Sequence, residues 1–141
     1  MDANNFYNEK DQVKSEDYLF VDALDFGTTY SGYVFSSRSE YRESPPKIHA
    51  NQAWNAGGCS LASMKTPTSL LLDSEGEFVS FGYEAKNKHG SLVMDGASDN
   101  YLFFSRFKMK LHNRDLLKED TQTPDISGKP WPAKDMFTKS I

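Results

Sequence analysis

The sequence has very little cysteine and no long apolar segment. Cys59 is the only cysteine among 141 residues, so an internal disulfide is excluded and there is no cysteine pair with the spacing of a metal site. The longest apolar runs, such as residues 70–72 and 101–104, are far shorter than the about 20 residues that a membrane-spanning helix needs. We therefore expect no membrane partner, and we expect a reducing, cytoplasmic location.

The chain also lacks an excess of positive charge. Its 16 Lys and Arg residues are outnumbered by 20 Asp and Glu residues, which gives a formal net charge of -4 and an isoelectric point near 5.3. Such a chain has no overall attraction for nucleic acid, so we expect no nucleic-acid partner. Residues 1–16 are polar and lack the apolar core of a secretory signal, and we expect them to form a disordered tail.

The most informative segment that is present is residues 25–33, which read DFGTTYSGY. It follows residues 18–24, a short run rich in aromatic and branched side chains that is typical of a mostly buried strand. Gly27 allows a sharp turn and a close approach of the backbone to a ligand, because it has no Cβ. We expect residues 32–35 to return as a second strand.

The chemistry of this turn suits a phosphate group. Successive backbone N–H groups in such a turn can form a concavity for phosphate oxygens, and Thr28 and Thr29 add hydroxyl groups. The carboxylate of Asp25 can hold a hydrated Mg²⁺ through the water ligands of the ion. The alternative interpretation is an ordinary tight hairpin, in which the Asp and Thr side chains satisfy local backbone groups.

Residues 25–31 resemble the first phosphate motif of the superfamily that contains actin, the sugar kinases and the seventy-kilodalton heat-shock proteins. A second stretch of the sequence supports this resemblance independently. Residues 65–72, followed by residues 81–86, are similar to the Thr-Pro strand and the Gly-x-x-Ala helix start of the heat-shock branch. Within that branch, the chain resembles the divergent 12A and 12B group in three segments, namely residues 31–33, 80–83 and 104–112.

This resemblance implies an α/β fold, namely part of an actin-like ATPase lobe of the ribonuclease H-like type. Residues 17–46 would form the first phosphate-binding hairpin of its inner sheet, and residues 47–125 an inserted α+β subdomain. Residues 126–141 would begin a truncated helix. The family's second lobe and second phosphate loop come downstream of such a segment, so we expect an N-terminal fragment that is inactive alone, with an exposed hairpin edge that favours aggregation.

The same resemblance implies ATP and Mg²⁺ as cofactors. The implied site consists of Asp25, Gly27, Thr28, Thr29, Tyr30 and Lys108. Asp25, Thr28 and Lys108 would be catalytic, with Asp25 holding Mg²⁺ through water and residues 27–30 holding the phosphates. The register near Lys108 leaves Lys110 as an alternative cation, and both lysines can instead belong to a solvated face of an amphipathic segment.

We expect the full-length protein to bind Mg-ATP between two lobes and to hydrolyse it as a chaperone-like ATPase. Its partners would be ATP and ADP, together with client proteins or co-chaperones. Two alternatives remain at this point. The chain can be a fragment of a small-molecule kinase of the same superfold, or a truncated, non-catalytic binding module.

Turn and period signals predict the other main elements. Residues 68–72 and 78–81 are expected to form a β-hairpin, because the turn between them places a glycine at its last position. Residues 82–89 predict a short helix that Gly90 closes, followed by a polar loop. Apolar residues recur near helical spacing in residues 102–117, which predicts a further helix.

Overall fold

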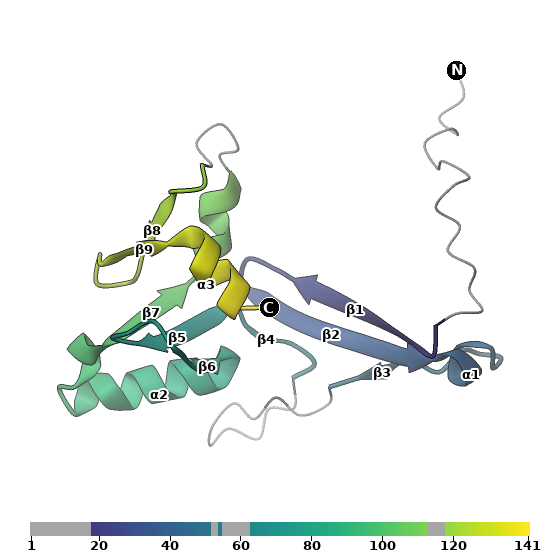
Figure 1. The fold of residues 1–141 in the computed structure, drawn as a ribbon. Helices are drawn as coiled ribbons and strands as arrows, with labels where there is room; N and C mark the ends of the chain where they lie inside the picture. Colours follow the sequence, from purple (N-terminus) through teal and green to yellow (C-terminus); the bar gives the residue numbers. More distant parts are fainter. Residues whose placement is uncertain (1–17, 52–53, 55–62, 113–117) are drawn as a thin grey trace.

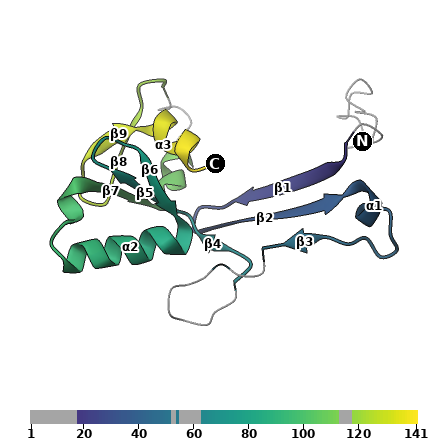
Figure 2. The same ribbon diagram turned by 60° about the horizontal axis from the view of Figure 1, so that its bottom comes forward.

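The computed structural model describes residues 18–51, 54, 63–112 and 118–141, except for the side chains of residues 110–112. The molecule consists of a long β-hairpin, here called the arm, which projects from an α/β unit (Figures 1 and 2). The fold is α/β, with antiparallel sheets and few helices. No helix in the described ranges is long and apolar enough to cross a membrane.

The arm is built on two paired strands. Strand β1 (Phe20–Phe26) runs antiparallel to β2 (Tyr30–Ser37) along its whole length. The other edge of β2 pairs with β4 (Thr66–Pro67) near the turn and with β3 (His49–Ala50) farther out. The short helix α1 (Arg38–Tyr41) lies at the end of the arm remote from the α/β unit (Figure 1).

The α/β unit has a three-stranded antiparallel sheet at its centre. Its middle strand is β5 (Ser69–Asp73), which pairs with β6 (Phe78–Phe81) on one side and β7 (Tyr101–Ser105) on the other. Helix α2 (Gly82–Met94) directly follows β6 and covers one face of this sheet (Figure 1).

Five smaller elements complete the described part of the unit. Two 3₁₀ helices flank β7, namely η2 (Ser98–Asn100) and η3 (Phe107–His112). The hairpin of β8 (Gln122–Pro124) and β9 (Pro130–Pro132) leads directly into helix α3 (Ala133–Lys139). This C-terminal part covers the sheet on the side away from α2 (Figure 1).

Side chains alternate between two small cores on either face of the sheet, as the geometry of a strand requires. On the α2 face, Leu71 of β5 packs with Ala85 and Phe103. On the opposite face, the buried cluster consists of Leu70, Leu72, Leu102, Phe104, Phe107 and Met136. Phe26, the last residue of β1, packs against that second cluster and so anchors the base of the arm in the α/β unit.

The predicted β-hairpin of residues 68–72 and 78–81 is confirmed by the pairing of β5 with β6. The predicted helix over residues 102–117 is wrong. Residues 102–104 are all buried in strand β7, because each face of this strand meets one of the two cores, and a 3₁₀ helix follows up to His112. Residues 113–117 lie outside the described residues.

The prediction that Gly90 closes the helix that begins at residue 82 is also wrong. Helix α2 continues through Gly90 to Met94, and Gly96 takes the positive φ of 67° that follows the helix end. A Cβ built on Gly90 would have no atom within 4 Å, so this position makes no steric demand for glycine. Both Gly90 and Gly96 carry the glycine signal for a helix end, and the helix ends just before Gly96.

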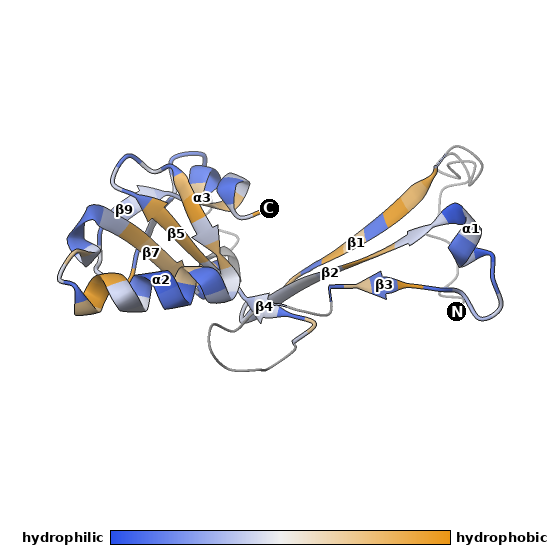
Figure 3. Ribbon diagram, turned by 90° about the horizontal axis from the view of Figure 1, so that it is seen from below, coloured by the Kyte–Doolittle hydropathy of each residue, from blue (hydrophilic) through white to orange (hydrophobic). Residues whose placement is uncertain are grey.

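The apolar side chains of the arm are largely uncovered. Phe20, Val21 and Leu24 of β1 are 61%, 65% and 56% exposed. Figure 3 shows the corresponding hydrophobic stretch of β1 lying clear of the α/β unit. The predicted strand forms, but the prediction that it is mostly buried is wrong, because no described segment covers these side chains.

Candidate functional site

Thr68 ties the turn of the arm to the α/β unit. Its hydroxyl donates to the carbonyl oxygen of Gly27 at 2.7 Å and lies 2.8 Å from the hydroxyl of Ser31. Its backbone N–H donates to the carbonyl of Thr29 at 2.9 Å, and the residue is only 1% exposed. Thr68 therefore joins residues 25–31 to residues 65–72, in addition to the pairing of β2 with β4.

The turn itself requires glycine at position 27. A Cβ built on Gly27 would lie 2.2 Å from the carbonyl oxygen of Tyr30, a distance that no real side chain tolerates. The steric demand therefore comes from within the turn. With glycine at this position, the chain reverses tightly enough to bring Thr28 and Thr29 to the tip.

Two carbonyl groups at the start of the turn, those of Phe26 and Gly27, accept hydrogen bonds from side chains of the α/β unit. The carbonyl of Phe26 accepts a hydrogen bond from the ammonium group of Lys108, and that of Gly27 accepts from Thr68. Because a trans peptide is planar, its N–H points opposite to its C=O. The N–H groups of Gly27 and Thr28 are accordingly directed away from Lys108 and Thr68, which suits the binding of an anion.

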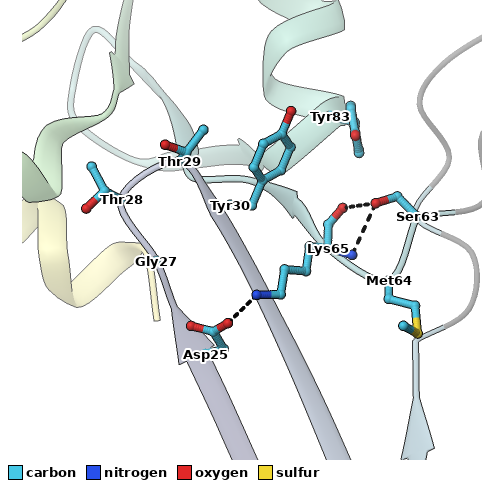
Figure 4. Close-up of a pocket in the computed structure, with 9 residues that line it drawn as sticks. All are labelled: Asp25, Gly27, Thr28, Thr29, Tyr30, Ser63, Met64, Lys65 and Tyr83. Atoms are coloured by element: carbon cyan, nitrogen blue, oxygen red, sulfur yellow. Dashed lines mark hydrogen bonds and ion pairs between the residues drawn. The ribbon is translucent and has the colours of Figure 1, made fainter.

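An open cleft of about 840 Å³ lies at this turn. Its volume falls within the range of small-molecule sites, roughly 300–1,000 Å³. The residues that line it are Asp25, Gly27, Thr28, Thr29, Tyr30, Ser63, Met64, Lys65 and Tyr83 (Figure 4). The cleft therefore brings together Asp25 and all of residues 27–30, which the sequence predicted as site residues. It also contains four residues that the sequence did not predict, namely Ser63, Met64, Lys65 and Tyr83.

Asp25 is paired with a lysine that sequence analysis did not assign to the site. The Lys65 ammonium donates a hydrogen bond to Asp25 Oδ2, and the two side chains point toward one another (Figure 4). This hydrogen bond and the adjacent positive charge lower the pKa of Asp25, and the charge of Lys108 lowers the pKa further. Asp25 is therefore ionised at neutral pH, as a carboxylate that is to hold a hydrated cation must be.

Lys108 lies near the turn but does not line the cleft. Besides its hydrogen bond to the Phe26 carbonyl, its ammonium lies 5.3 Å from the centroid of the Phe26 ring. In this structure it supports the backbone at the end of β1. The side chain of Lys110, the alternative cation, lies outside the described residues.

Tyr83 reaches the cleft because the start of α2 is fixed against β4. The buried Thr66 hydroxyl accepts a hydrogen bond from the backbone N–H of Tyr83 at 2.9 Å. Gly82 adopts a φ of +71°, and a Cβ there would lie 2.0 Å from Thr66 Oγ1. The Thr-Pro segment and the glycine at the helix start thus form one packed joint.

The residues that line the cleft contribute the Asp25 carboxylate, the Lys65 ammonium, hydroxyl groups and backbone N–H groups. Among the described residues, no group of three or more His, Cys, Asp and Glu side chains is placed to hold a metal ion. Asp25 contributes one ionised carboxylate, which fits a magnesium ion that keeps most of its water ligands. The donor set therefore fits a hydrated Mg²⁺ beside a phosphate group.

Comparisons with known proteins agree on one group of relatives. Heat shock 70 kDa protein 12B from Homo sapiens is 43% identical over 124 residues, or 88% of the chain. Heat shock 70 kDa protein 12A is 35% identical in Mus musculus and 36% identical in Homo sapiens, in each case over 100% of the chain. No family model and no solved structure matches.

The chain spans only 17% to 20% of the length of these relatives. Within that span the similarity includes the turn of the arm and the segment of Thr68, since two of the matches extend over the whole chain. Over this span the chain is similar to the heat shock 70 kDa proteins 12A and 12B.

Proposed function

We propose that this chain supplies the first phosphate-binding part of a Mg-ATP site in a chaperone-like ATPase. The observation that carries the proposal is the joint made by Thr68, which holds the turn of residues 27–30 beside the ionised carboxylate of Asp25. The similarity to heat shock 70 kDa proteins 12A and 12B supports nucleotide and magnesium as the ligands.

Each group at the cleft has a definite task under this proposal. The N–H groups of Gly27 and Thr28 bind phosphate oxygens, and the hydroxyls of Thr28 and Thr29 add further hydrogen bonds. Asp25 binds the water ligands of Mg²⁺, and the ion, when bound, neutralises charge on the phosphates. Tyr30 forms part of the wall of the cleft.

In architecture, we propose that the arm is the first hairpin of the inner sheet of an actin-like lobe. Residues 47–125 then form the inserted α+β subdomain, and residues 126–141 begin the part that follows it. The exposed apolar side chains of β1 support this assignment, since an inner-sheet strand would be covered by the rest of its lobe. Hydrolysis of ATP, exchange with ADP, client proteins, co-chaperones and a cytoplasmic location are proposed for the whole protein.

The test is the substitution Asp25→Asn in the full-length protein. We expect it to remove most Mg²⁺-dependent ATP hydrolysis while the fold is retained, because Asn keeps the size of the side chain and loses its charge. The matched control is Asp22→Asn, which changes another exposed carboxylate of the same strand, three positions before Asp25. Equal turnover in the Asp25→Asn variant and the wild type would remove the basis for the assignment.

A further inference from the structure

Lys65 places an ammonium group in the cleft, although sequence analysis assigned this lysine no role in the site. It comes from the end of the segment that leads into β4, directly before Thr66. From there the side chain crosses β2 and reaches Asp25 on β1, so a single ion pair spans the strands that flank the cleft (Figure 4).

The path of this lysine depends on Gly32. In the β1–β2 pairing, Gly32 lies directly opposite Asp25. A Cβ on Gly32 would lie 3.1 Å from Lys65 Cγ and 3.1 Å from the carbonyl oxygen of Met64, closer than most real contacts. Gly32 therefore leaves room for the aliphatic stem of Lys65 to lie across β2, which brings its ammonium to the carboxylate.

The ion pair between Lys65 and Asp25 contributes little to the stability of the fold. The Lys65 and Asp25 side chains are 54% and 59% exposed. Ion pairs with this exposure contribute little to folding stability, since water screens the charges and both side chains lose rotamer freedom. The pair is thus easily opened, and its ammonium group lies in the same cleft as Thr28 and Thr29.

We propose that Lys65 is a phosphate-binding residue, which pairs with Asp25 in the absence of nucleotide and moves to the terminal phosphate of a nucleoside triphosphate. The inference rests on the proposed function. A triphosphate brings negative charge to the cleft, and lysine is a common phosphate ligand whose flexible stem allows its charge to move. Transfer of Lys65 to the phosphate also leaves Asp25 free for a hydrated Mg²⁺.

The first test compares equilibrium binding of ATP and of adenosine to the full-length protein. Lys65→Met removes the charge and keeps an unbranched side chain. We expect about tenfold weaker binding of ATP, equivalent to about 1.4 kcal/mol, and no change for adenosine. Lys47→Met is the control, because it removes another exposed ion pair, with Glu43, and lies outside the cleft.

A second comparison separates phosphate binding from simple neutralisation of Asp25. In the Asp25→Asn background and without Mg²⁺, Lys65 has no carboxylate at position 25 to neutralise. We expect Lys65→Met to weaken ATP binding about tenfold in this background also. A lysine that acts only as the counter-ion of Asp25 would give no change.

The outcomes distinguish the two proposals. If wild-type protein binds no ATP, the proposed function fails. If the wild type binds ATP and the Lys65→Met substitution has no effect in either background, only the assignment of Lys65 fails. Circular dichroism checks the folding of each variant, and Lys65→Gln, with the same expectations, replaces any Met variant that does not fold.

Discussion

At Gly27 the backbone leaves no room for a side chain. A methyl group there would lie 2.2 Å from the carbonyl oxygen of Tyr30, so an alanine must open the turn that presents Thr28 and Thr29. This single position therefore couples the stability of the turn to the geometry of the cleft.

We expect Gly27→Ala to destabilise the full-length protein by about 1–3 kcal/mol and to weaken ATP binding, since the backbone must distort. Gly90→Ala is the control. Gly90 lies in the interior of α2 with open space around its Cα, so alanine should stabilise the helix by roughly 0.5–1 kcal/mol. Chemical denaturation measures both changes, and a Gly27→Ala variant as stable as the wild type would contradict the steric argument.

Glu40 provides a pH-dependent contact at the far end of the arm. Hydrogen bonds from the hydroxyl of Ser37, from His49 and from the Ser37 backbone lower the pKa of Glu40 to about 2. A carboxyl group whose pKa is lower in the folded state stabilises the fold above its unfolded pKa. That contribution is lost as the pH falls from the ordinary value of 4.5 towards 2.

The expected result is a melting temperature that is higher for the wild type than for Glu40→Gln at neutral pH. The difference should shrink steadily below about pH 4.5 as Glu40 becomes protonated. Thermal unfolding followed by circular dichroism at several pH values makes this comparison. A difference that stays constant down to about pH 3 would show that the charge of Glu40 has no part in it.

At the scale of the elements, the joint between the arm and the α/β unit depends on Thr68. Thr68→Val would leave the Gly27 carbonyl and the Ser31 hydroxyl without this buried partner, which we expect to cost about 1–3 kcal/mol and to weaken ATP binding. Thr123→Val is a matched control, because Thr123 is 2% exposed and its Oγ1 has no hydrogen-bond partner within the described structure. Equal losses of stability in the two variants would contradict a special role for Thr68.

The sequence predicted the elements whose signal is local. The turn at Gly27 and the hairpin of β5 and β6 carry glycines in their own turns, beside short apolar runs, and both are confirmed. Strand β7 was mistaken for a helix, since its burial on both faces comes from α2 and Met136, which are distant in sequence. Local spacing cannot report contacts of that kind.

The residues of the cleft also differ in whether local sequence could predict them. Asp25 and residues 27–30 could be found because they are adjacent in one motif, and they do lie together. Lys65 was missed, although it directly precedes the Thr-Pro segment, because its partner is 40 residues away and the path between them depends on strand pairing. The glycine at position 32 is the sequence signal that could have suggested the contact, since it leaves space opposite Asp25.

For the molecule as a whole, the long arm is the feature with the largest consequence. Phe20, Val21 and Leu24 expose apolar surface on a strand whose outer edge is unpaired within the described sheet. Exposed apolar edge strands favour association between chains. The 141-residue chain studied alone should therefore be marginally stable and self-associating.

Light scattering during size-exclusion chromatography measures the molecular mass of the 141-residue chain in solution and so tests for self-association. Val21→Lys with Leu24→Lys should reduce the association, because charged residues on an edge strand oppose pairing. A matched pair of exposed sites in α2, Lys86 and Lys88, changed to Glu, should have no such effect. A monomeric wild-type chain with a reversible melting transition would contradict the prediction.

The most direct test of the account is a calorimetric titration of the full-length protein with ATP in the presence of Mg²⁺. We expect saturable binding of one ATP per chain, which weakens when Mg²⁺ is removed or when Asp25 is replaced by Asn. Absence of binding by folded wild-type protein, or binding that neither Mg²⁺ nor the Asp25→Asn substitution affects, would contradict the assignment of this turn as a magnesium-dependent phosphate site.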